Sequence, residues 1–173
     1  MRSLHLIEPP LLDLLPQDPR IQTMDTTVRR IQLSHGDSGD EATTEAFFAM
    51  LGAGHIPERL RGTPEWDQLV QHANRFSRSE PAGDYPSAAL QRLPRSLPVA
   101  LYSGGRSHPA LRAIVRELAA RIEGSRVTDI ASAGHAVQMA GAAFVDPLLA
   151  STTEADALWN KRTSAQVADT AGK

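Results

Sequence analysis

The chain has 173 residues, of which 41% are hydrophobic and 22% charged, proportions typical of a globular domain long enough for one apolar core. Its formal net charge of −2 lacks the excess of lysine and arginine that nucleic-acid binding needs, and the absence of cysteine excludes disulfides and thiolate metal sites. Without a run of roughly 20 apolar residues or a signal-peptide pattern, the chain is expected to be cytoplasmic and to bind no membrane.

The first predicted element is a short strand over Ser3–Ile7. It stops at Glu8, since Pro9 and Pro10 cannot donate to a strand ladder. An apolar strand this close to the first residue needs neighbouring strands to pair with.

The block from residue 11 to residue 95 reads as mostly short helices. Thr63 and Pro64 form a typical start, an N-cap followed by proline in the first helical position. The glycines of Gly36–Gly39 interrupt the helical pattern before a new helix. The apolar residues of this block either pack as core or line a substrate pocket beneath a helical lid; they are Phe47, Phe48, Met50, Leu51 and Trp66.

From Leu97 the pattern changes to strand, helix, strand, helix. Apolar runs at residues 98–102 and 126–131 predict buried strands, and the spacing of residues 111–122 predicts an amphipathic helix capped by Ser107 or a neighbour. This alternation predicts an α/β fold with a short parallel sheet of about three strands and flanking helices. We divide the chain into a domain at 1–150 and a polar, loosely docked tail at 151–173.

Ligands of open α/β sheets bind beyond the carboxyl ends of the strands. Three segments fall there: Glu8, the loop Ser103–His108, and the Gly134-His135 turn. An imidazole titrates near neutral pH, so His135 is a candidate general base, although a surface histidine bonded to backbone would have the same sequence pattern.

Three other motifs have weaker functional interpretations. Gly36–Gly39 reads GDSG like a serine protease, but that motif belongs to a β-barrel, and an N-cap explains it more simply. His35, Asp37 and Asp40 offer metal ligands, yet we expect no metal there. The glycines before Arg106 suggest a phosphate cradle but match no nucleotide fingerprint.

The segments RSLHLIEPP, the helical block with GDSGDEATTEAFFAMLGAG, and LPVALYSGG through SRVTDIASAGHAVQM together resemble the carboxyl-terminal half of an α/β-hydrolase. The resemblance covers residues 2–151. It implies a sixth strand, a helical cap, seventh and eighth strands, and a loop in which His135 is the histidine of a catalytic triad.

The same resemblance implies that Glu8 is the triad acid. Many members place an aspartate after the seventh strand, where this chain has Ser107 and no carboxylate; others place the acid after the sixth strand, where Glu8 stands. The nucleophile elbow, G-x-S-x-G, would precede Glu8, so the resemblance places it upstream of Met1 and leaves no nucleophile in this chain.

Two functions therefore stay open. The first is hydrolysis of an ester-like or related small molecule in the complete enzyme, with no cofactor and with a serine or aspartate nucleophile. The second is a non-catalytic remnant or small-ligand-binding domain. In either case an uncovered edge of the strand at Ser3–Ile7 favours self-association.

Overall fold

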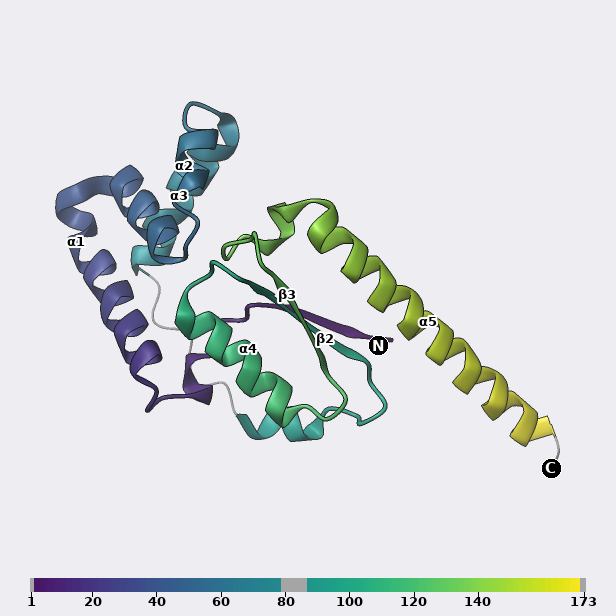
Figure 1. Ribbon diagram of the computed structural model, residues 1–173. Helices are drawn as coiled ribbons and strands as arrows, with labels where there is room; N and C mark the ends of the chain where they lie inside the picture. Colours follow the sequence, from purple (N-terminus) through teal and green to yellow (C-terminus); the bar gives the residue numbers. More distant parts are fainter. Residues whose placement is uncertain (1, 79–86, 172–173) are drawn as a thin grey trace.

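The computed structural model describes residues 2–78 and 87–171 (Figure 1). Its centre is a parallel sheet of three strands in the order β1-β2-β3. The strands are β1 (Leu4–Ile7), β2 (Val99–Gly104) and β3 (Arg126–Ile130). The predicted mixed α/β fold with a short parallel sheet is therefore confirmed, and all three strands begin within three residues of their expected positions.

The described residues also form five α-helices and three short 3-10 helices. In chain order they are η1 (Leu12–Leu14), α1 (Pro19–Met50), α2 (His55–Leu60), α3 (Pro64–Arg78), η2 (Ser87–Arg92), α4 (Pro109–Arg121), η3 (Val137–Ala140) and α5 (Ala142–Ala171). Residues 79–86 of the predicted helical block lie outside the described residues. Most of the remainder of that block is helical, as expected; α2 and α3 lie beyond the carboxyl ends of the strands, whereas η2 lies near the start of β2 (Figure 1).

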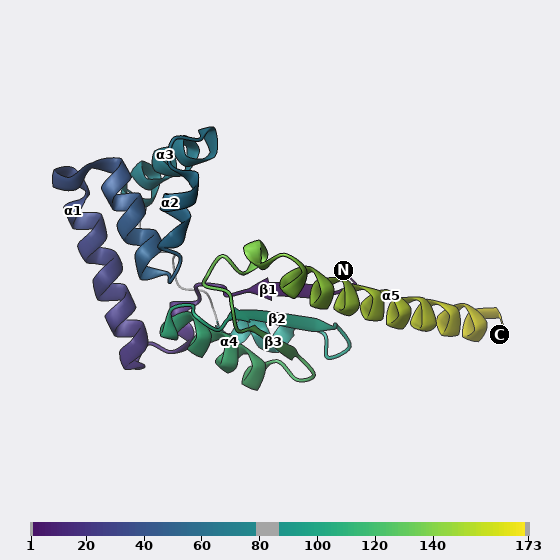
Figure 2. The ribbon, with the colours of Figure 1, turned by 45° about the horizontal axis from the view of Figure 1, so that its top comes forward.

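The sheet has two covered faces (Figure 2). Because side chains alternate along a strand, Leu4, Leu6 and Leu101 point to one face, where they pack with the apolar side of α4. Tyr102 points to the other face and meets Phe144 of α5 edge-on, with ring centroids 5.3 Å apart. The two helices therefore enclose the sheet from opposite sides.

The apolar residues of the helical block are mainly core. Leu51 and Trp66 are buried, and Phe47 and Met50 pack against the cluster that includes α4. The Trp66 indole N–H donates to Glu41 Oε1 at 3.2 Å, which satisfies its one polar atom. Of the two interpretations, packing explains these side chains without a substrate.

The expected break at the GDSG motif lies at Gly39. This residue has φ 80° and ψ 173° inside α1, so the helix is interrupted there and the chain turns back on itself (Figure 1). Only glycine adopts such a conformation at low cost. The prediction of separate helical segments on either side of the motif is confirmed.

The tail differs from expectation. Instead of a loose segment from residue 151, α5 continues to Ala171. Arg2 pairs with Asp156 at 3.2 Å and lies 5.7 Å from the centre of the Trp159 ring. Contacts with the strand region therefore continue along the helix well past residue 151. None of the helices in the described residues is long and apolar enough to cross a membrane.

Three helices, α1, α3 and α4, begin with the same kind of cap. Asp18, Thr63 and His108 each precede a proline, and each side chain accepts a hydrogen bond from the first turn of its helix. The predicted cap at Thr63 is confirmed. For α4 the cap is His108 rather than Ser107: His108 Nδ1 accepts from the Ala110 amide at 3.1 Å.

Because capping requires a neutral Nδ1, stability should depend on the state of His108. Burial lowers the pKa of this imidazole below its usual 6.5. The unfolded chain then takes up a proton that the folded chain resists, so this contribution to stability is complete above about pH 6.5 and decreases as the pH falls below it. We expect His108→Asn, which caps without titrating, to reduce this pH dependence in urea unfolding. Identical pH profiles for both proteins would contradict the assignment.

Candidate functional site

Glu8 lies at the end of β1 and is fully buried. Its amide continues the ladder by donating to the Tyr102 carbonyl at 3.2 Å. Its φ of 38° is in the left-handed region, where non-glycine residues are uncommon and strained. The backbone thus turns sharply at Glu8, and its carboxyl group lies within reach of the end of β2.

Four donors surround the Glu8 carboxylate. Oε1 accepts from Ser103 Oγ at 3.2 Å and from the Gly104 amide at 2.8 Å. Oε2 accepts from Ser107 Oγ at 2.6 Å and bonds His135 Nδ1 at 2.8 Å. A buried carboxylate is tolerated only when its oxygens are satisfied in this way.

The arrangement fixes the state of the His135 ring. An ionised carboxylate only accepts hydrogen bonds, so Nδ1 must carry the proton that it shares with Glu8. In the neutral ring Nε2 is then the basic nitrogen, and no described residue forms a hydrogen bond with it. The His135 side chain is 32% exposed, which leaves the ring accessible.

Close backbone contacts hold the His135 loop against its neighbours. A side-chain carbon on Gly134 would overlap the Gly52 carbonyl, and one on Gly104 would overlap the carbonyls of Ala133 and Gly134. The Arg106 amide also donates to the Ala133 carbonyl at 2.9 Å. Three distant segments therefore meet at the site because glycines let their backbones touch.

The structure brings together the two predicted site residues, Glu8 and His135, and adds two that sequence reasoning missed. The sequence places Ser103 and Ser107 in the loop after β2, and it predicts for Ser107 a helix cap and the position where the resembling family often has its acid. Both hydroxyls instead donate to Glu8. The available signal was a pair of hydroxyl residues in the loop adjacent to a strand-end carboxylate.

The phosphate-cradle interpretation of the loop after β2 is not supported, since its amides are already used. Gly104 donates to Glu8, Gly105 to the Ile130 carbonyl, Arg106 to Ala133, and Ser107 to the Gly104 carbonyl. An anion would find no free amide among these four. The donors of this loop that do bind an anion, the Gly104 amide and the hydroxyls of Ser103 and Ser107, bind the carboxylate of Glu8.

The HGDSGD segment shows neither catalytic nor metal-binding geometry. Ser38 Oγ donates to the Ser34 carbonyl at 2.7 Å, and His35 Nε2 pairs with Asp40 Oδ1 at 2.5 Å. Within residues 2–78 and 87–171, no group of three potential ligands could hold a metal ion.

No protein-family model, curated protein or solved structure matches this chain. The chemical interpretation therefore rests on the geometry of Glu8, His135 and their neighbours.

The contact between Gly134 and Gly52 can be tested directly. We expect Gly134→Ala to displace the His135 loop, because the added carbon overlaps backbone that cannot move aside. Overpacking of this kind costs about 1–3 kcal/mol. Urea unfolding should show this loss, and proton NMR should show the loss of the hydrogen-bonded Nδ1 proton of His135.

Gly36→Ala is the matched control. It lies in α1 with no atom within 4 Å of the added carbon, so alanine should leave stability unchanged or raise it slightly. Equal effects of the two substitutions would show that the close approach is not what holds the loop.

Proposed function

We propose that Glu8 and His135 are the acid and base of a hydrolytic site in an α/β-hydrolase-like protein. The single observation that supports this most is the 2.8 Å hydrogen bond between His135 Nδ1 and a fully buried carboxylate with three further donors. In triad chemistry, such a carboxylate selects the imidazole tautomer and stabilises the imidazolium that forms during reaction.

The chemistry follows from the free nitrogen of His135. Nε2 takes a proton from an attacking group, and the ring becomes an imidazolium paired with Glu8. The same proton then passes to the leaving group. The substrate class that fits is a small ester-like molecule, hydrolysed by addition of water across the bond to the leaving oxygen.

In this proposal the attacking group comes from outside residues 1–173. A serine would make an acyl-enzyme, which water then cleaves with His135 as base. An aspartate would instead give an alkyl-enzyme ester, which suits dehalogenation or epoxide opening. With a serine, the Glu8–His135 pair acts as base both for the attack and for the water that cleaves the acyl-enzyme; with an aspartate, which is already ionised, it acts only on the water that cleaves the ester.

A second function has an observation in its favour. Ser103, Gly104 and Ser107 together bind Glu8 independently of His135, so the carboxylate also ties β1 to β2 and to the start of α4. A non-catalytic remnant or small-ligand-binding domain would keep this structural role. The two functions predict different effects of replacing His135, because only the catalytic function requires this residue.

We expect His135→Ala to lower kcat for ester hydrolysis by the natural gene product by about 10²- to 10⁴-fold, as loss of a general base does. Glu8→Gln should lower kcat with little change in KM, since the amide cannot stabilise the imidazolium. His108→Asn is the control, because its side chain caps α4 and does not contact Glu8 or His135. Hydrolysis that survives His135→Ala refutes the catalytic proposal, and so does an absence of hydrolysis in the unsubstituted protein.

The proposed function also includes self-association at the open edge of β1. The amides of Leu4 and Glu8 donate toward β2, so alternation turns those of His5 and Ile7 outward. Ile7 is 37% exposed, and β1 is one of the two edge strands of the described sheet. Unpaired strand edges of this kind pair with other chains.

Light scattering after size exclusion should therefore detect dimers or larger species. Ile7→Lys should shift the population toward monomer, because a charged edge disfavours pairing. Leu33→Lys, at an 83% exposed position on α1, should have no effect. A monodisperse monomer at high concentration would exclude association through this edge.

A further inference from the structure

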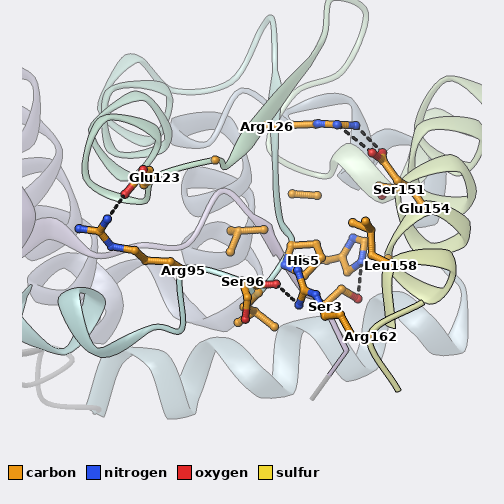
Figure 3. Close-up of a pocket in the computed structure, with 16 residues that line it drawn as sticks. Ser3, His5, Arg95, Ser96, Glu123, Arg126, Ser151, Glu154, Leu158 and Arg162 are labelled. Carbon is orange, nitrogen blue, oxygen red and sulfur yellow. Dashed lines mark hydrogen bonds and ion pairs between the residues drawn. The ribbon is translucent and has the colours of Figure 1, made fainter. Parts of the chain in front are cut away.

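A cavity lies at the opposite end of the sheet from Glu8. It has a volume of about 180 Å³ and opens where β2 and β3 begin, with α5 from Ser151 to Arg162 as one wall (Figure 3). There is room for a small organic molecule.

Part of the cavity wall is apolar. The segment leading into β2 supplies one side of this wall and α5 supplies the other; the residues are Leu97, Pro98, Val99, Ala100, Ala155 and Leu158. Apolar lining with a few placed polar groups is typical of small-molecule sites. A ligand with a hydrocarbon portion would gain from contact with this surface.

Three polar side chains of the cavity wall, Ser3, His5 and Ser151, form a hydrogen-bond network with Tyr102. His5 bonds Tyr102 Oη through Nδ1 at 3.3 Å and Ser3 Oγ through Nε2 at 3.1 Å. The Tyr102 hydroxyl also bonds Ser151 Oγ on α5 at 2.8 Å. This network links β1, β2 and α5 and fixes the His5 ring.

Of the three arginines around the cavity, two pair with carboxylates of the described residues and one does not. Arg126 forms two bonds with Glu154, and Arg95 lies 3.3 Å from Glu123 (Figure 3). Arg162 reaches from α5 to the Ser96 carbonyl at 2.5 Å, and no carboxylate in the described residues pairs with it. A guanidinium has five N–H donors, so Arg162 keeps several for a ligand.

We propose that this cavity binds a short-chain organic carboxylate. Arg162 receives the carboxylate, because a guanidinium matches its two oxygens with parallel hydrogen bonds. The hydrocarbon portion lies against Leu97, Val99 and Leu158. Inorganic phosphate fits less well, since it carries more charge than one uncompensated arginine matches and leaves the apolar wall unfilled.

Binding would connect α5 to the sheet. Arg162 and Leu158 lie on α5, whereas Leu97 and Val99 precede or begin β2. A ligand that contacts both binds the folded state only, so it should raise the unfolding temperature. The proposal does not rest on the Glu8–His135 site, and neither result decides the other.

The test is an NMR titration of the isotope-labelled protein with sodium butyrate. We expect saturable shifts of the amides around Ser96, Val99 and Ala155. Butyramide, which has the same size without the charge, and inorganic phosphate should each bind more weakly than butyrate. Arg162→Gln should weaken butyrate binding by about tenfold or more, as loss of a charge-assisted hydrogen bond does.

Two further variants separate binding from folding. Arg30→Gln removes an exposed arginine of α1 and should leave butyrate affinity unchanged. Leu158→Ala keeps Arg162 and should weaken butyrate more than acetate, because only butyrate reaches the apolar wall. Equal affinities for butyrate and butyramide, unchanged affinity in Arg162→Gln, or shifts that do not saturate would each overturn the proposal.

Discussion

The buried carboxylate of Glu8 is the constraint on which the carboxyl-terminal end of the sheet depends. An ion removed from water costs several kcal/mol unless other groups replace its hydration. Here the replacements come from the end of β2, from the turn before α4 and from the loop after β3. Satisfying one charge thus requires three segments to converge, and the same convergence orients the His135 ring. The carboxylate that holds these segments together is therefore also the proposed acid of the catalytic pair.

The sheet has different chemistry at its two ends because its strands are parallel. The carboxyl ends of all three strands lie at one end of the sheet, with Glu8 and His135. The amino ends lie at the opposite end, with Arg126 and Arg162. The α5 helix spans both regions: it follows the His135 loop through η3 and continues to Arg162 beside the cavity.

Local patterns predicted most of the architecture. The apolar runs gave the strands, the cap at Thr63 gave the start of α3, and glycine gave the break in α1 at Gly39. Prediction was less accurate where tertiary contacts compete with local ones. Ser107 has the chemistry of a helix cap, but the buried charge of Glu8 binds its hydroxyl, and His108 caps the helix instead. The region after residue 151 looked loose by composition, yet contacts from Arg2 and Ser96 accompany a continuous helix.

The sequence by itself determined the alternation of strand and helix, the parallel sheet, and the placement of Glu8 and His135 after strands. These features follow from patterns within a few residues, because such local patterns determine secondary structure directly. Only the tertiary structure decided that Glu8 bonds His135, 127 positions away, that Ser107 serves the same carboxylate from 99 positions away, and that Arg162 reaches the cavity at Ser96. Such contacts depend on the register of the strands and on which backbone segments come into contact at the glycines. No local sequence pattern encodes either.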